Sequence, residues 1–186
     1  VAPVKLPQQH VAHEWAPLNF KSAFSFMDSL LNPASVVALA VEKHCKAVAI
    51  TDPNLHGSVE FFAAAKEAGI KPIIAAEIIH HGKPVLAYVR NAIGYQNLCA
   101  ILTLPTRVMA PDRGEGLILR PANWLPEIRY SDPTEKPMFE VLQSIRTLSL
   151  LDERNIQKRK GHFHFPDPVE LTSHRVALKD SLDLAE

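Results

Sequence analysis

Two carboxylates lie where the strands of an α/β protein would end. Asp52 closely follows the apolar run 47–50, and Glu77 lies in a second apolar run, 72–79. In parallel α/β folds, functional side chains gather at the carboxyl edge of the sheet. A buried carboxylate at this edge needs a metal ion, an arginine or backbone amides as its partner, because an unpaired buried charge is costly. Metal binding and ion pairing are therefore the chemistry to consider for Glu77.

The elements that position these carboxylates form one unit. The run 47–50 has no polar alternation, which is typical of a strand covered on both faces. Ser58 is expected to cap the helix that follows, and Gly69 suits the left-handed conformation that ends it. Four apolar positions of this helix are expected to share one face: Val59, Phe62, Ala63 and Ala65. With the strand 72–79, the helix makes a βαβ unit, which predicts a parallel sheet.

The rest of the chain supplies further elements. Residues 18–20 are expected to form a first strand, and Asn32 with Pro33 is a typical helix start. The segment 73–89 is either a hairpin or two adjacent barrel strands. Residues 138–151 predict an amphipathic helix. Its apolar positions are Met138, Val141, Leu142, Ile145 and Leu148.

Length and composition indicate a globular domain with no net charge. Of 186 residues, 47% are hydrophobic, and 20 basic residues balance 20 acidic ones. With a net charge of zero, we expect no DNA binding by this chain alone. Cys45 and Cys99 lack paired-ligand spacing, which favours a cytoplasmic location and disfavours a thiolate zinc site. No apolar stretch approaches membrane-spanning length and the start lacks a signal pattern, so no membrane association is expected.

Three histidines offer an alternative metal site. His56, His80 and His81 lie in turns near predicted strand ends, and with Glu77 they could hold a metal ion whose activated water cleaves a phosphoester. Exposed turn histidines without a metal ion are the other interpretation. The basic run 154–160 suggests either a contact with a phosphate backbone or a solvated loop, and the zero net charge favours the loop.

Several segments together resemble the PHP (polymerase and histidinol phosphatase) domain of bacterial C-family DNA polymerases, the DNA polymerase III alpha subunits, and are most similar to the error-prone branch. They are Phe20–Asp28, Ala49–Asp52, Gly57–Phe61, Ala68–Glu77 and Gly94–Leu98, with 127–130 and 139–146 resembling the end of the domain. The resemblance implies a distorted (β/α) barrel with mainly parallel strands. The barrel is expected to be abbreviated, because the residues between 102 and 127 are mostly loop.

The resemblance also implies a metal cluster at the carboxyl ends of the strands. The carboxylate ligands of the family fall on Asp28, Glu77 and Glu127 of this chain. Its histidine ligands fall on other residue types: Asn19, Lys21, Pro53, Pro84 and Arg129. Two or three carboxylates do not suffice for a cluster. The hypothesis is that Lys21 and Arg129 replace the metal ions by pairing with the three carboxylates.

These observations lead to one interpretation and one alternative. The interpretation is an irregular arm at 1–17, a PHP-like domain at 18–150, and an extension at 151–186 with a basic loop and a helix. The domain is expected to be non-catalytic and to need no cofactor, serving as a scaffold or binding a DNA polymerase or another replication or repair protein. No Asp-x-Asp pair suited to two-metal nucleotidyl transfer is present.

The alternative is a metal-dependent phosphoesterase or 3′–5′ exonuclease. Its zinc or manganese site would be rebuilt from His56, His80 or His81 around Asp28 and Glu77. A truncated relative without activity is a third possibility.

Overall fold

The computed structural model describes residues 15–153 and 155–186, so most of the predicted arm at 1–17 lies outside the described residues. Among those residues, no helix is long and apolar enough to cross a membrane. In chain order the elements are α1 (Pro33–Glu42), β1 (Ala47–Ile50), α2 (Ser58–Ala68), β2 (Lys71–His80), β3 (Lys83–Val89), α3 (Ala92–Leu102), η1 (Pro111–Arg113), β4 (Leu117–Pro121), η2 (Pro133–Glu135), α4 (Lys136–Thr147), η3 (Glu170–His174) and α5 (Arg175–Ala185).

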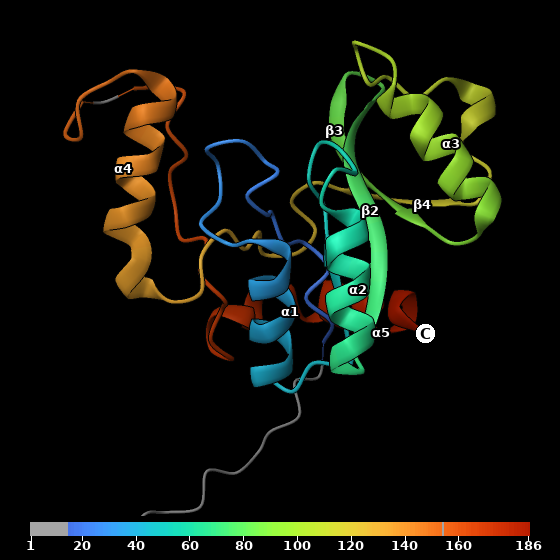
Figure 1. Ribbon diagram of the computed structural model, residues 1–186, viewed down its shortest axis with the longest axis horizontal. Coiled ribbons are helices and arrows are strands. Elements are labelled where there is room, and N and C mark those ends of the chain that lie inside the picture. Colours follow the sequence, from blue (N-terminus) through green and yellow to red (C-terminus); the bar gives the residue numbers. More distant parts are fainter. Residues whose placement is uncertain (1–14, 154) are drawn as a thin grey trace, which may run out of the picture.

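The named strands form an open four-stranded sheet in the order β1-β2-β3-β4 (Figure 1). β1 and β2 pair in parallel around α2, which confirms the predicted βαβ unit and the mixed α/β class. β2 with β3 and β3 with β4 pair antiparallel. The sheet is therefore only partly parallel, and the four named strands form an open sheet that does not close into the expected barrel.

A two-residue turn explains the change of direction. β2 ends at His80 and β3 begins at Lys83, and the two residues between them, His81 and Gly82, have φ values of 49° and 72°. Two consecutive positive φ angles are typical of the tight turns that join antiparallel strands. A parallel return would need a crossover of about a dozen residues. Of the two alternatives for the segment 73–89, the hairpin is correct.

The parallel half of the fold extends beyond β1. Phe20 forms parallel bridges with both Ile50 and Ile128. The predicted strand 18–20 is thus reduced to one bridging residue, yet it lies between β1 and the segment around Ile128. β1, the segment at Phe20 and the segment around Ile128 run in the same direction, so their carboxyl ends meet at one edge of the fold. The middle of β2 lies at the same edge.

The helices cover this framework with two hydrophobic clusters. α1 begins as predicted, with the Asn32 side chain accepting the Ser35 N–H at 2.7 Å. α2 ends at Gly69 in the left-handed conformation, also as predicted. The expected cap at Ser58 is wrong, since Ser58 is the first helical residue and the N-cap position is Gly57. The buried positions of α2 include Phe61 and Ala65. Of the predicted face, Ala65 is buried, but Val59 and Phe62 are exposed. Two apolar rows lie side by side on this helix, and the periodicity does not distinguish them.

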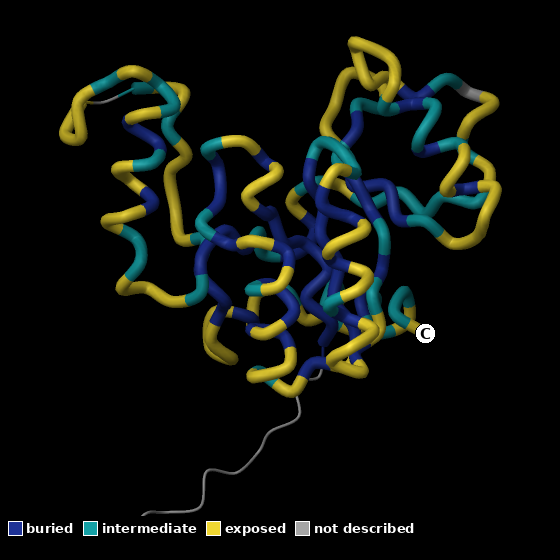
Figure 2. Tube along the Cα trace, in the orientation of Figure 1, coloured by how far each residue is buried: buried dark blue, intermediate teal, exposed yellow. Residues whose placement is uncertain are grey.

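The C-terminal residues pack on the same core as the predicted domain 18–150. Phe165 and Leu171 belong to the main hydrophobic cluster with α1, β1 and α2, and Leu178 of α5 packs against it. The second cluster lies between α3 and the sheet, where Leu98 and Ile101 contact β2 and β3 residues. Figure 2 shows the buried backbone concentrated where these elements meet.

α4 stands at one side of the molecule (Figure 1). It is shorter than predicted, ending where Leu148 adopts a φ of 51°. The amphipathic pattern is present, but the helix buries Phe139, Gln143 and Ser144 and turns most of its apolar positions to solvent.

Candidate functional site

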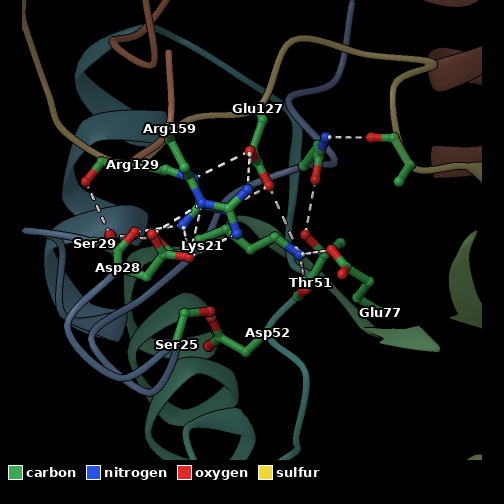
Figure 3. Close-up of polar contacts among 12 residues, drawn as sticks. Lys21, Ser25, Asp28, Ser29, Thr51, Asp52, Glu77, Glu127, Arg129 and Arg159 are labelled. Atoms are coloured by element: carbon green, nitrogen blue, oxygen red, sulfur yellow. Dashed lines mark hydrogen bonds and ion pairs between the residues drawn. The ribbon is translucent and has the colours of Figure 1, made fainter. Parts of the chain in front are cut away.

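A buried lysine lies at the carboxyl edge of the parallel segments. Lys21 follows the bridging residue Phe20, and its Nζ lies 2.8 Å from Oε2 of Glu77 on β2 (Figure 3). The same Nζ donates to the Thr51 carbonyl and lies 3.9 Å from Oε1 of Glu127. Lys21 therefore links three neighbouring segments through one ammonium group, and the partner that Glu77 requires is this lysine.

A fully buried arginine forms the second ion-paired centre. Arg129 binds Glu127 in a bidentate manner, with Nη2 at 2.8 Å from Oε1 and Nε at 3.1 Å from Oε2. Its Nη1 lies 2.8 Å from Oδ2 of Asp28 and also donates to the Asp28 carbonyl. Paired, charge-assisted hydrogen bonds of this kind fix an arginine firmly. The predicted pairing of Lys21 and Arg129 with the three carboxylates is present.

Three further side chains complete the network around Asp28, and sequence reasoning missed all three. Arg159 places Nη2 at 2.7 Å and Nε at 2.8 Å from Oδ2 of Asp28. From α4, Gln143 donates to Oδ1 at 2.9 Å, and Arg146 Nη1 lies 3.6 Å from the same oxygen. The predicted solvated loop at 154–160 therefore supplies a site residue.

The sequence held one signal for Arg159, namely that the predicted site had more negative than positive side chains. Three carboxylates faced only two cations, Lys21 and Arg129, so a partly buried cluster lacked one positive charge. The run 154–160 is the nearest concentrated source of positive charge after the predicted domain. The balance indicates that a further cation is needed, although it does not select Arg159 within the run.

Asp52 and Asn19 serve the framework. The Asp52 carboxylate accepts the Ser22 backbone N–H at 2.8 Å, the Ser25 hydroxyl at 2.5 Å and the Ser22 hydroxyl. The Asn19 amide donates to two backbone carbonyls, and its oxygen accepts the Thr51 hydroxyl at 2.9 Å. Both side chains are buried, and these bonds hold together the loops that carry Lys21 and Asp28.

The environment of Asp28 shifts its protonation equilibrium. Burial by itself raises the pKa of Asp28, but the hydrogen bond from Arg159 and the charges of Arg129 and Arg159 outweigh it and lower the pKa below its ordinary value. For Arg159, burial opposes the charged form, and the hydrogen bond and charge of Asp28 reverse this, so that its pKa is raised. The pair is therefore held in its ionised form.

The lowered pKa of Asp28 predicts a loss of stability in acid. A group whose pKa is depressed by folding stabilises the protein above its unfolded pKa, about 3.9 for aspartate, and this contribution disappears as the pH falls through the folded pKa. We expect urea unfolding between pH 6 and pH 2.5 to show this loss in the wild type. Asp28→Asn, although less stable at neutral pH, should lose less on acidification, and an equal loss in both proteins would contradict the assignment.

The predicted histidine site is not assembled. His80 and His81 lie side by side at the hairpin turn, with ring centroids 4.0 Å apart and the ring planes tilted by 50°, and His56 is exposed in the turn before α2. Pro53 follows Asp52 in that turn, and Pro84 is exposed on β3. Within residues 15–153 and 155–186, no three His, Cys, Asp or Glu side chains are grouped so that they could hold a metal ion.

Comparison with known proteins decides the family. The family model of the PHP domain matches residues 17–162, more than three quarters of the chain. The chain belongs to the PHP domain family. It is 38% identical over 95 residues to the DNA polymerase III subunit alpha of Mycoplasma genitalium, covering 49% of this chain and 11% of that protein. It is 30% identical over 187 residues to the error-prone DNA polymerase of Anaeromyxobacter dehalogenans, covering 94% of this chain and 15% of that protein.

This PHP chain thus spans less than a sixth of the length of those two polymerases. Among solved structures, it is similar to a two-domain protein from Bacteroides vulgatus containing a predicted PHP-like metal-dependent phosphoesterase. The TM-score is 0.34 at 17% identity, with 42% of this chain and 27% of that chain covered. A similarity this weak carries no argument, so the family assignment rests on sequence.

The residues present do not fit the metal cluster that the family resemblance implies. Asp28 and Glu127 are bound by Arg129 and Arg159, and Glu77 is bound by Lys21. The cationic side chains occupy the positions around the carboxylates from which a metal ion would be coordinated. The site as folded holds its loops together through these ion pairs.

Proposed function

We propose that this chain is a non-catalytic PHP domain, a scaffold or partner-binding module used with a DNA polymerase or another cytoplasmic replication or repair protein. The observation that carries the proposal is the ion pairing of every carboxylate that falls on a family ligand position. Asp28 alone receives two arginines and an amide at 2.9 Å or less. The family relationship to polymerase subunits supports the replication setting.

The charge of the network argues further against a metal ion. Three carboxylates face four cationic side chains within 4 Å: Lys21, Arg129, Arg146 and Arg159. Counting three negative and four positive charges leaves a net charge of +1 before any metal ion enters. A divalent cation would be repelled unless an arginine left, and Arg129, which binds two of the three carboxylates, is fully buried.

The rival function is a metal-dependent phosphoesterase or 3′–5′ exonuclease. That activity would require Arg129 and Arg159 to withdraw from Asp28, and ligands such as His56 or His80 to approach it. The rival therefore predicts retained metal that depends on Glu77 or Asp28, whereas the scaffold predicts none.

Metal retention tests the proposal directly. After incubation with zinc or manganese chloride and desalting, we expect elemental analysis to find far less than one metal ion per chain. Lys21→His/Arg129→His, which restores two family ligand positions, serves as a matched comparison and is expected to retain more metal if it folds, as judged by circular dichroism. Near-stoichiometric metal in the wild type that is lost in Glu77→Ala would overturn the proposal and favour the phosphoesterase.

A further inference from the structure

The segment 136–161, which contains α4, leaves the core of the molecule and returns to it at the same place. The backbone N–H of Arg129, before the segment, donates to the carbonyl of Phe163, after it, at 2.7 Å. The N–H of Phe165 likewise donates to the Ser131 carbonyl at 3.3 Å. Because its two ends are joined in this way, the segment can swing outward without breaking any strand pairing of the sheet.

The segment takes no part in the two hydrophobic clusters. Within the described residues, neither cluster contains a side chain from 136–161. The buried ring of Phe139 packs with its centroid 5.3 Å from that of Tyr130 and 5.7 Å from that of Phe163. Since those two rings lie where the segment leaves and returns, they hold the base of α4, and the far part of the segment needs another attachment (Figure 1).

That attachment is one carboxylate. Three side chains in the described part of the segment make hydrogen bonds or ion pairs to the core, and each of them binds Asp28 (Figure 3). They are Gln143 at 2.9 Å, Arg159 at 2.7 Å and Arg146 at 3.6 Å. Two of the three also make longer contacts, at 3.4 Å to the Met27 carbonyl and at 3.9 Å to Oε2 of Glu127. The far part of the segment is thus fixed chiefly by the charge of Asp28.

The segment is also tied to itself. Arg146 of α4 donates to the Gln157 carbonyl at 2.8 Å, and Lys158 Nζ donates to the carbonyls of Leu150 and Leu151. These bonds connect α4 to the residues that follow it and do not involve the core. A region with internal bonds and few buried apolar contacts to its surroundings is expected to open locally and as one unit.

We propose that residues 136–161 form a flap that opens while the sheet stays folded, with the Asp28 carboxylate as the clasp that closes it. In the open state Asp28 keeps Arg129, which belongs to the core, and loses Arg146 and Arg159. Three carboxylates then face two cations, so the site changes from a net charge of +1 to −1. Opening therefore reverses the charge that the site presents to a partner.

Hydrogen exchange of the full chain, followed by mass spectrometry, tests the flap. A helix of 12 residues is only marginally stable once it has undocked, so opening exposes the amides of α4 to exchange. In the wild type at neutral pH, we expect peptides from α4 to exchange faster than peptides from α2, a core helix of 11 residues. Exchange in α4 as slow as in α2 would overturn the proposal.

Arg159→Gln tests the clasp. The substitution removes the flap's closest ion pair to Asp28 and leaves Arg129 bound to the same carboxylate, so the core keeps its own ion pairs. We expect exchange in α4 to become about tenfold faster or more, because a hydrogen-bonded charge is lost at the clasp, while exchange in α2 changes far less. An equal acceleration in both helices would show that the whole domain opens together, and would contradict a flap.

Glu140→Gln is the matched control on the flap itself. Glu140 is exposed on α4 and makes no ion pair with any residue that the structure describes. Exchange in α4 should stay close to the wild-type rate in this variant. If the control accelerates it as much as Arg159→Gln does, the effect comes from the helix and not from Asp28, and the clasp is refuted. Metal retention is measured separately, so this test and that of the proposed function can fail independently.

Discussion

Arg129→Met is expected to lower the free energy of unfolding by about 3–5 kcal/mol. The arginine is fully buried and binds Asp28 and Glu127, whose side chains are largely shielded from water. Methionine fills a similar volume without the charge. Most of the lost stability therefore comes from the repulsion between two carboxylates that no longer share a cationic partner. Urea titration at neutral pH measures the change through the shift of the unfolding midpoint.

The matched control for Arg129 is Arg113→Met, at an exposed arginine of η1. Surface substitutions of this kind usually change stability by at most about 0.5 kcal/mol. If Arg129→Met also cost less than about 1 kcal/mol, the network would contribute little, because breaking a buried pair normally costs several times more.

Lys21→Met should give the second largest effect, a loss of about 2–3 kcal/mol. The substitution leaves the Glu77 carboxylate and the Thr51 carbonyl without their donor. The Glu77 side chain is 31% exposed, so water can replace part of the lost interaction, and the effect is smaller than for Arg129. The same urea titration measures it.

A double-mutant cycle separates the ion pair from the packing of the lysine stem. Lys21→Met/Glu77→Gln removes both charges, and neutralising a buried pair costs less than leaving one charge alone. We therefore expect the double variant to be more stable than Lys21→Met by about 1 kcal/mol. Strict additivity of the two single substitutions would show that Lys21 and Glu77 do not stabilise each other.

Local patterns in the sequence predict the βαβ unit well, because each part has its own signal. The runs 47–50 and 72–79 are largely apolar, and Gly69 marks the end of α2 between them. The direction of β3 has a weaker signal: a His-Gly turn is compatible with a hairpin but does not demand one, so the positive φ angles decide it.

Periodicity indicates that a helix has an apolar side without indicating where that side points. On α2, the rows containing Val59 and Phe61 are adjacent, and packing against α1 and β2 selects Phe61. On α4 the usual rule that the apolar side faces inward is reversed, because Gln143 and Arg146 of the polar side are needed at the site. Family positions identified the three carboxylates and their first two cations, whereas Arg159 has no local signal because its partner is distant in sequence.

The contact between Asp28 and Arg159 spans 131 residues. During synthesis at about 5–20 residues per second, Asp28 is made roughly 7–26 seconds before Arg159, the last of its arginine partners in the chain. The βαβ unit ends at His80, so it can form on the ribosome while Asp28 still lacks all three of its arginine partners. Translation of the residues up to 159, and not the formation of the sheet, therefore sets the earliest moment at which the ion-pair network of the site is complete.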